Sequence, residues 1–279
     1  MPVLRHWIID IPFFDIDYGF AISSSLKFNP EGDLVRRFKK LCPGKDYNEG
    51  LLIHTAAALP DPRLLKGHMP LPFWPPNILD KAKLYMPLPF WPPNILDKAK
   101  VMYLARDPRD VVVSCYHFFQ SSKQTRVTAT LDEFVEDFMD DIILSAYWEH
   151  VRLAWEKRNN PNFLFLFYED LKENPNEEIK KVDQFIGTNR SQNQIENVAN
   201  YTGFNSMKEK YKDNIPVSFD KIYYDDSKTD KENGFFRKGK VGSWKEDLPL
   251  HLQEKMNSWM KFNLSQFSED FKYKKEQFS

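Results

Sequence analysis

The sequence predicts an α/β fold around a parallel sheet, because short apolar segments alternate with amphipathic helical patterns along most of the chain. Three segments are expected to be strands, at residues 63–65, 101–105 and 163–167. The second and third are apolar without alternation, which is typical of strands covered on both faces. With 279 residues, the chain is long enough for a substantial core, and we expect a single domain over residues 1–279.

Helical patterns fill the space between the second and third strands. One helix is predicted to begin at Pro108, because Asp107 suits the N-cap and proline suits the first helical position. Thr130 and Glu133 form a capping box, which opens a long helical pattern that continues through Trp155. Its acidic run indicates a solvated helix face rather than a metal site, since no histidine or cysteine joins it.

Two further helices are expected in the C-terminal half. Residues 177–187 form an amphipathic pattern that ends at a glycine, and a last pattern covers residues 252–262. Between them, residues 211–233 are polar, charged and without periodicity, as is typical of a mobile loop.

The composition excludes several classes of protein. Since 39 basic residues face 40 acidic ones, nothing global favours nucleic acid as a partner. Cys42 and Cys115 cannot form a disulfide framework and lack zinc-site spacing, so we expect no metal and a reducing, cytoplasmic compartment. Charged residues interrupt the apolar stretches of the N-terminus, so neither a signal peptide nor a contact with the membrane is expected.

A 15-residue segment occurs twice without a single change, at residues 69–83 and 86–100. Repeat proteins show several diverged units, so two identical copies indicate a recent duplication or an assembly error. Each copy begins too rich in proline for a strand, and only residues 77–83 or 94–100 suit a short helix. We therefore expect residues 69–100 to form an extra surface loop.

Arg106 and Ser114 flank the start of the helix predicted at Pro108. Free backbone N–H groups and the helix dipole favour an anion there. Arg106 ends the preceding strand and Ser114 lies on the helix face of the cap, so the two side chains suit a phosphate clamp. In the alternative interpretation, Arg106 is tied to Asp110 and Ser114 bonds back to its own helix. The segment alone leaves both interpretations open.

A second cluster of cations lies near the C-terminus. Arg237, Lys238 and Lys240 surround Gly239, where the backbone can approach a ligand closely. Three cations beside a glycine suit a phosphate group, and the alternative is an ordinary solvated basic loop.

His68 follows the first predicted strand, with Lys66 just before it. At such a position a histidine can act as a general base, and a lysine can polarise an anionic group. The alternative is a structural histidine, which is the commoner role for a lone one.

Five segments together resemble motifs of the cytosolic sulfotransferase family. Lys66-Gly-His-Met-Pro is similar to the family's Lys-Thr/Ser-His-Leu-Pro, and Arg106-Asp-Pro-Arg-Asp-Val-Val-Val-Ser114 is similar to its Arg-Asn-x-Lys-Asp-x-x-Val-Ser. The others are Tyr168-Glu-Asp-Leu-Lys, Thr202-Gly-Phe-Asn-Ser-Met207 and Arg237-Lys-Gly-x-x-Gly-x-Trp-Lys245. The resemblance runs from about Pro60 to the C-terminus and is broken only by the duplication.

The resemblance implies transfer of a sulfonate from 3′-phosphoadenosine 5′-phosphosulfate (PAPS) to a hydroxyl or amine of a small apolar acceptor, such as an alcohol or phenol. It also implies a three-layer α/β fold like that of P-loop NTPases. His68 would take the acceptor's proton, and Lys66 would contact the transferring group. The implied co-substrate residues are Arg106, Ser114, Arg237, Lys238 and Gly239 at the 3′-phosphate, and Tyr168, Thr202, Phe204 and Met207 at the adenine.

The sequence departs from the family pattern in its N-terminal part. It contains no Tyr-Pro-Lys-Ser-Gly-Thr-Thr-Trp loop, which cradles the 5′-phosphosulfate in the family, so we expect an N-terminally incomplete domain without its first strand–loop–helix unit. The duplication also places His68 38 positions before Arg106, and removal of one repeat period would leave 21. If the insert loops outward, His68 keeps its place. If the second copy replaces the first, residues 84–85 take that place.

The family's dimer motif, Lys-x-x-x-Thr-Val-x-x-x-Glu, is altered as well. Lys245 and Glu254 keep the spacing, but Pro249 and Leu250 replace Thr-Val, which weakens the expectation of a homodimer through residues 245–254.

We therefore predict an enzyme of sulfotransferase lineage with impaired transfer, because preorganised donors of this kind carry much of the transition-state stabilisation. The alternative is a non-catalytic protein that binds nucleotide or acceptor through the retained 3′-phosphate half-site. A P-loop kinase or nucleotidase is disfavoured, because Gly-x-x-x-x-Gly-Lys-Ser/Thr is absent.

Overall fold

The computed structural model describes residues 30–31, 33–49, 51–58, 63–66, 82–85, 95–121, 128–142, 146–211 and 236–275. The chain divides into two compact units. Unit 1 is Met1–Tyr103 with Glu156–Phe165, and unit 2 is Leu104–Trp155 with Leu166–Ser279. The single domain over residues 1–279 stays a prediction, as does the lack of its first strand–loop–helix segment. The mobile loop expected at residues 211–233 lies outside the described residues except for its first residue.

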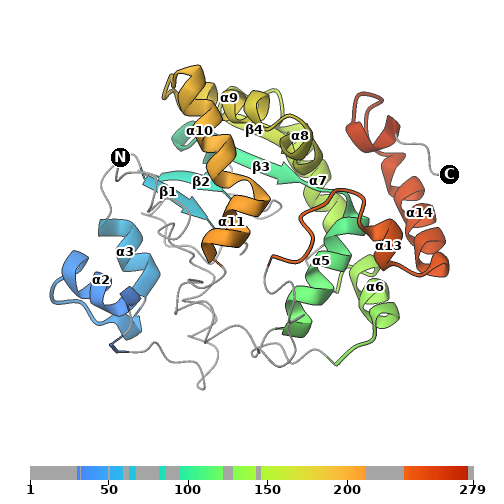
Figure 1. The fold of residues 1–279 in the computed structure, drawn as a ribbon, viewed down its shortest axis with the longest axis horizontal. Helices are drawn as coiled ribbons and strands as arrows, with labels where there is room; N and C mark the ends of the chain where they lie inside the picture. Colours follow the sequence, from blue (N-terminus) through green and yellow to red (C-terminus); the bar gives the residue numbers. More distant parts are fainter. Residues whose placement is uncertain are drawn as a thin grey trace. The chain divides into compact units, whose positions relative to one another are not determined.

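A four-stranded sheet confirms the predicted α/β class (Figure 1). Its strands run in the order β1 (Arg63–Lys66), β2 (Ala82–Tyr85), β3 (Val101–Ala105) and β4 (Phe163–Phe167). β1 and β2 are parallel, as are β2 and β3, and the register places Leu84 opposite both Leu65 and Val101. The three strands expected from the sequence are confirmed, since apolar runs of this kind suit a sheet interior.

β2 is the strand that the sequence did not predict. Its first two residues end the first repeat copy and its last two follow that copy. The corresponding positions at the second copy are residues 99–102, and β3 begins at the third of them. The end of the first copy thus belongs to a strand, whereas the second copy ends just before one, and β2 lies between β1 and β3. Pairing on both sides satisfies its backbone polar groups, which a surface loop would leave to water. Regular structure therefore replaces the expected loop at Ala82–Tyr85.

Helix α4 (Ile95–Lys98) is the second regular element in the repeat, and it confirms the short helix expected at residues 94–100. Most other residues of the segment 69–100 lie outside the described ranges, so an extra surface loop there stays a prediction.

Unit 1 contains a small helical cluster besides its part of the sheet. α2 (Asp33–Leu41), the 3-10 helix η2 (Tyr47–Glu49) and α3 (Leu51–Ala58) contact one another. Their shared core consists of Val35, Phe38, Cys42 and Leu51, all buried. On the sheet itself, Tyr103 packs against Phe163 and Phe165.

Unit 2 is organised around the helices that follow β3. They are α5 (Pro108–Ser121), α6 (Leu131–Met139), α7 (Tyr147–Glu156), α13 (Trp244–Asp247), α14 (Leu250–Leu264) and the 3-10 helix η5 (Lys272–Lys275). Residues of α5, α6, α13 and α14 form one apolar core around Val112, Phe138, Trp244 and Met256. The helix expected near residues 252–262 is confirmed by α14.

The long helix expected from Thr130 through Trp155 is wrong, because two helices occupy this stretch. The capping box is confirmed, since the Thr130 side chain accepts from the backbone N–H of Glu133, and the Glu133 side chain accepts in return. α6 then ends at Met139, and the backbone turns out of the helical region at Asp141, where φ is 60°. The chain becomes helical again at Tyr147.

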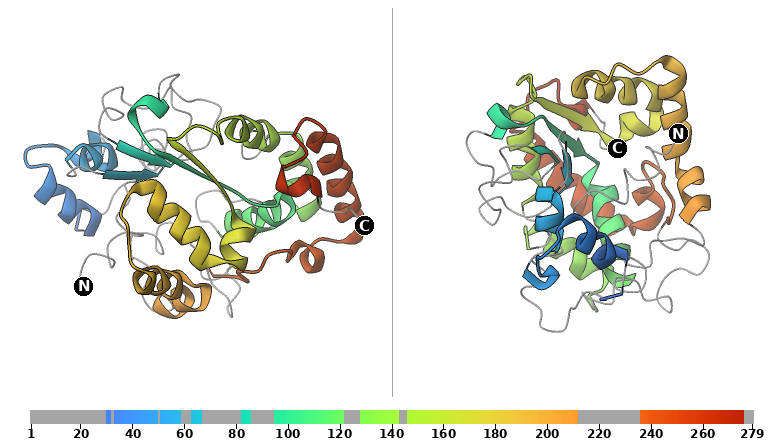
Figure 2. Two further views of the ribbon diagram at one scale, coloured as in Figure 1. Left: turned by 90° about the horizontal axis from the view of Figure 1, so that it is seen from above. Right: turned by 90° about the vertical axis from the view of Figure 1, so that its left-hand side faces the viewer.

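Four consecutive helices follow β4, and each contacts the next (Figures 1 and 2). They are α8 (Tyr168–Glu173), α9 (Pro175–Ile186), α10 (Gln192–Thr202) and α11 (Phe204–Tyr211). The glycine stop is confirmed, because Gly187 caps α9 with φ of 81°. Among the described residues, no helix combines the length and the apolar character needed to cross a membrane.

The central place of β2 leads to a prediction for Lys83→Pro. Proline has no N–H to donate to a neighbouring strand and is confined to strand ends, edges and bulges. The free energy of unfolding of the variant should therefore be about 2 kcal/mol lower than that of wild type. Lys83→Thr keeps the N–H and a good strand former, and should stay close to wild type. Denaturant unfolding measures both. Equal stability of the two variants would mean that β2 does not pair as described.

Candidate functional site

The first turn of α5 is closed by the chain's own carboxylates. Asp107 caps the helix as predicted, since its Oδ1 accepts from the backbone N–H of Arg109 at 2.8 Å, and Pro108 is the first helical residue. The same carboxylate holds the Arg109 guanidinium, with Nη2 2.6 Å from Oδ2. The backbone N–H of Asp107 donates to Glu169 Oε1 at 2.8 Å. These two N–H groups are therefore not available to an anion.

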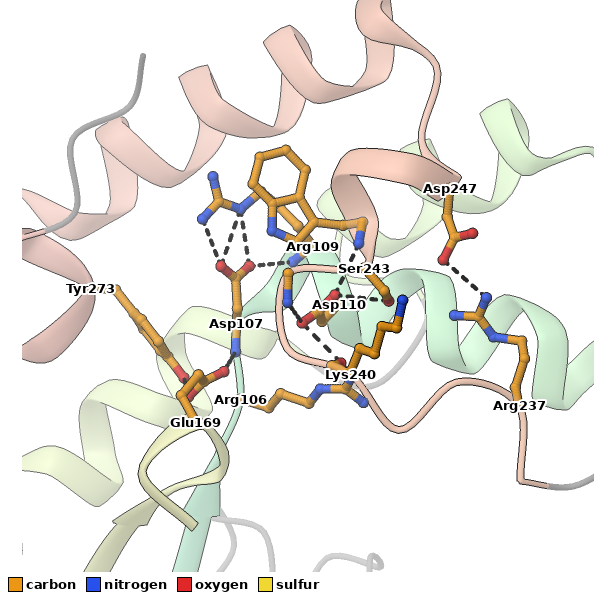
Figure 3. A network of polar contacts seen from close by, with 12 residues as sticks. Arg106, Asp107, Arg109, Asp110, Glu169, Arg237, Lys240, Ser243, Asp247 and Tyr273 are labelled. Atoms are coloured by element: carbon orange, nitrogen blue, oxygen red, sulfur yellow. Dashed lines mark hydrogen bonds and ion pairs between the residues drawn. The ribbon is translucent and has the colours of Figure 1, made fainter. Parts of the chain in front are cut away.

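Arg106 lies just after the carboxyl end of β3, and its guanidinium contacts both Tyr168 and the chain at Lys240; Figure 3 shows the side toward Lys240. On one side the guanidinium carbon is 4.5 Å from the centre of the Tyr168 ring. On the other, Nη2 donates to the backbone oxygen of Lys240 at 3.4 Å. Its Nε is buried and has no hydrogen-bond partner among the described residues. A buried guanidinium N–H without an acceptor is the kind of group that an anionic ligand satisfies.

Asp110 fixes the basic loop, residues 236–243, to the first turn of α5. Its carboxylate accepts from the backbone N–H of Gly242 at 2.7 Å and of Trp244 at 3.0 Å, and from the Ser243 hydroxyl at 3.3 Å. The side chain is completely buried. Arg106 Nη2 is 3.7 Å from Asp110 Oδ2, so the ion pair of the alternative interpretation exists but is long. The predicted phosphate clamp at the start of α5 and the predicted cluster of cations near the C-terminus are thus connected through one carboxylate (Figure 3).

Arg237 and Lys238 lie in the basic loop but contact acidic residues of α13. Arg237 Nη1 is 2.9 Å from Asp247 Oδ2, and Lys238 Nζ is 2.7 Å from Asp247 Oδ1. Lys238 Nζ also lies 3.0 Å from Glu246 Oε2. These bonds raise the pKa of Lys238. Burial would raise the pKa of Asp247, but the bonds from Lys238 and Arg237 outweigh it, and the pKa is lowered.

Gly239 is required where the basic loop passes the ring of Phe204. Its φ is +61°, and a Cβ there would lie 2.1 Å from Phe204 Cδ2. The close approach expected at this glycine is therefore made in this structure by an aromatic side chain, the first residue of α11. The same ring packs edge-on against Phe236. Both expected halves of a nucleotide site, phosphate and adenine, meet at this contact.

The other predicted residues are placed as follows. Thr202 ends α10, and its hydroxyl donates to the backbone oxygen of Val198 at 2.8 Å. Met207 lies half-buried on α11, and Ser114 lies half-buried on α5. Lys66 is the last residue of β1 in unit 1, and its side chain is not among those described. His68 lies outside the described residues, so the roles of Lys66 and His68 stay predictions.

A buried pair behind the site was missed by the sequence reasoning. Glu169 follows Tyr168 at the start of α8, and Tyr273 donates its hydroxyl to Glu169 Oε2 at 2.9 Å. Burial raises the pKa of Glu169 and outweighs the bonds from Asp107 and Tyr273, which lower it. The motif Tyr-Glu-Asp pointed to Glu169, but no local signal identified Tyr273 as its partner.

Comparisons with known proteins match this chain to one family. A family model described as the sulfotransferase domain matches residues 48–268. The chain belongs to the sulfotransferase family. Rat sulfotransferase 1A1 is 33% identical over 218 residues, which cover 78% of this chain and 66% of the rat protein. Bovine sulfotransferase 1E1 is 32% identical over 197 residues, covering 70% of this chain and 60% of that relative. The match thus spans just under two thirds of the rat relative and less of the bovine one.

Solved structures of sulfotransferase-like proteins resemble the fold. Retinol dehydratase in complex with retinol and PAP has a TM-score of 0.66 and 30% identity, and the match covers 94% of this chain and 72% of the retinol dehydratase chain. A structure of retinol dehydratase with androsterone and the inactive cofactor PAP has a TM-score of 0.64 and 28% identity, and the match covers the same fractions of the two chains. Mouse sulfotransferase SULT7A1 with PAP, at 22% identity and a TM-score of 0.57, covers 75% of this chain and 78% of its own and supports the fold alone.

Asp110→Ala tests the junction between α5 and the basic loop. The substitution leaves buried N–H donors without an acceptor, so the free energy of unfolding should fall by about 2–4 kcal/mol. Glu136→Ala is a matched control, because Glu136 pairs with Lys255 at the exposed surface of the same unit. It should change stability by about 0.5 kcal/mol or less. Urea unfolding distinguishes the two, and similar values would contradict the role given to Asp110.

Glu169→Gln tests the buried acid. A carboxyl with a raised pKa binds its proton more tightly in the folded chain, so its contribution is complete below its ordinary pKa of 4.5 and is lost as pH rises through the raised pKa. As pH rises from 4.5 through the raised pKa, the free energy of unfolding should therefore fall more for wild type than for Glu169→Gln. Urea unfolding at several pH values measures the slopes. Glu173→Gln, at an exposed position of α8, should keep the wild-type slope, and an unchanged slope in Glu169→Gln would contradict the expectation.

Proposed function

We propose that this chain is a sulfotransferase that takes a sulfonate from PAPS and passes it to a hydroxyl or amine of a small apolar acceptor. Membership of the family supports the reaction class. The related retinol dehydratase structures contain PAP, the bisphosphate that remains when PAPS gives up its sulfonate. The same structures contain retinol and androsterone, which are small apolar alcohols and support the proposed class of acceptor.

The observation that carries the proposal is the placement of the Arg106 guanidinium. It lies against the basic loop, keeps a buried N–H without a partner among the described residues, and stacks on Tyr168. Guanidinium groups in this state are suited to a phosphate, which accepts several charge-assisted hydrogen bonds at once. We therefore assign the 3′-phosphate of the nucleotide to Arg106, with Arg237, Lys238, Gly239 and Ser114 as further donors around it.

The adenine is assigned to the side chains beside this loop. Tyr168 and Phe204 offer aromatic faces, and Thr202 and Met207 belong to α10 and α11, which flank Phe204 in the chain. PAPS as co-substrate supplies the sulfonate and a stable bisphosphate leaving group. On the acceptor side, the resemblance assigns the proton of the attacking hydroxyl to His68 and a contact with the transferring group to Lys66.

We further propose that this chain by itself transfers sulfonate slowly. They contain no loop of the Tyr-Pro-Lys-Ser-Gly-Thr-Thr-Trp type, and each lost donor of that kind costs about 3–4 kcal/mol of transition-state stabilisation. The alternative is a non-catalytic protein that binds the nucleotide. It is favoured by one observation, that the residues assigned to the nucleotide are retained while a loop of this type is absent from the sequence.

The remaining expectations stay proposals. A cytoplasmic location, the absence of a metal, and the absence of nucleic acid or membrane as a partner rest on the composition alone. Dimerisation through residues 245–254 is compatible with Leu250, which is 70% exposed.

Calorimetry with adenosine 3′,5′-bisphosphate tests the nucleotide site. Wild type should bind, and Arg106→Gln should bind about tenfold more weakly or worse, because it removes a partly buried charge from the phosphate. Arg152→Gln is the matched control, since Arg152 pairs with Glu149 along α7. It should bind within about twofold of wild type. Folded protein that shows no binding would contradict the proposed function.

A sulfonate-transfer assay with PAPS and a model phenol then separates the two forms of the proposal. Binding of the nucleotide with slow transfer supports an impaired enzyme, and binding with no transfer above background supports the non-catalytic alternative. Transfer at rates typical of enzymes, about 1–1,000 per second, would contradict the proposed impairment.

A further inference from the structure

The cations assigned to the 3′-phosphate already hold an anion that belongs to the protein. Asp247 bridges them, with Oδ1 2.7 Å from Lys238 Nζ and Oδ2 2.9 Å from Arg237 Nη1. The three side chains are largely shielded from water, at 14% exposure for Asp247, 19% for Arg237 and 29% for Lys238. Shielding strengthens such pairs relative to pairs at the open surface.

Asp247 occupies these cations in the way that a phosphate would. One carboxylate oxygen faces each cation, and a phosphate offers its oxygens to neighbouring donors in the same manner. Among the described residues, Arg237 and Lys238 are the hydrogen-bond partners of the Asp247 side chain. Within the described part of the chain, no backbone N–H donates to this side chain, in contrast to Asp110, whose oxygens accept from Gly242, Ser243 and Trp244.

The carboxylate is held in place, whereas the cations end long side chains. Asp247 ends α13, whose first residue, Trp244, is buried and donates its N–H to Asp110. The next residue, Leu248, is 3% exposed and packs in the core of unit 2. Arginine and lysine side chains have several rotatable bonds, so they can change partners while Asp247 keeps its position.

The local charge is nearly balanced before any ligand arrives. Arg106, Arg237, Lys238 and Lys240 face the carboxylates of Asp110, Glu246 and Asp247. The pKa of Asp247 is lowered, with the bonds from its two cations outweighing its burial, so this carboxylate is charged at neutral pH. A phosphate dianion that enters the cluster therefore meets a fixed negative charge on the donors that it needs.

We propose that Asp247 competes with the 3′-phosphate of the nucleotide for Arg237 and Lys238, and thereby limits the affinity of the site for its nucleotide. The inference rests on the proposed function and adds a residue that sets the strength of binding. Glu246 shares only Lys238 and is 61% exposed, so its effect is smaller. Retention of product limits turnover in many enzymes, and an internal competitor of this kind favours release of the bisphosphate.

Asp247→Asn is the decisive variant, because asparagine has nearly the same shape and no charge. Calorimetry at low salt should show adenosine 3′,5′-bisphosphate bound about three- to tenfold more tightly than by wild type, the scale of one partly shielded charge. Adenosine 5′-monophosphate, which lacks the 3′-phosphate, should bind with unchanged affinity. Added salt should reduce the gain, because it screens the repulsion.

Two control variants accompany it. Glu246→Gln should tighten binding by less than Asp247→Asn. Glu136→Gln removes one exposed carboxylate of an ion pair elsewhere in unit 2 and should leave both affinities unchanged, which separates the local effect from the change in net charge. Thermal unfolding verifies that each variant is folded.

Equal or weaker binding of the bisphosphate by Asp247→Asn would overturn the inference, because Asp247 would then position the cations instead of competing for them. A gain that is equal for the monophosphate would overturn it as well. In both cases wild type still binds and Arg106→Gln still loses affinity, so the proposed function survives. If neither wild type nor Asp247→Asn binds the bisphosphate while folded, the proposed function itself fails, and the inference fails with it.

Discussion

The buried carboxylate of Asp110 is the interaction on which the rest of the site depends. It belongs to the first turn of α5 but accepts its hydrogen bonds from Gly242, Ser243 and Trp244, more than 130 positions later in the chain. A buried carboxylate is tolerated only when hydrogen bonds and a cation compensate for lost water. Asp110 has both, because Arg106 lies 3.7 Å away. This one group therefore places the basic loop beside Arg106, and also anchors the start of α13, which presents Asp247.

Local signals explain how much of the fold could be predicted. β3 and β4 were found with their observed bounds, because an apolar run between helical patterns has few other interpretations. The cap at Asp107, the capping box at Thr130 and the glycine stop at Gly187 were found because each depends on neighbours within a few positions. The pair Arg106 and Ser114 and the cations around Gly239 were identified from the sequence and from the resemblance. Their connection through Asp110 could be seen only in the folded structure.

Features that depend on distant partners could not be read from the sequence. β2 has only four residues next to proline-rich segments, and its strand character comes from the pairing with β1 and β3. The break after α6 has no glycine or proline at its positive-φ residue, Asp141, so the helical pattern looked continuous. The bonds from Tyr273 to Glu169 and from Arg237 to Asp247 join groups whose contact is set by packing.

The acids of the site show that the partners of a carboxylate determine its role. Asp107 caps a helix and holds Arg109, and Asp110 is surrounded by N–H and O–H donors of the backbone and Ser243, so a ligand cannot replace either without unfolding a turn. Among the residues that the structure describes, Asp247 is bound only by cations on long side chains. Exchange there costs no backbone hydrogen bond, since a phosphate offers anionic oxygens to the same donors. In the proposed site, one acid, Asp110, therefore builds the loop, and a second, Asp247, is held only by groups that can change partners.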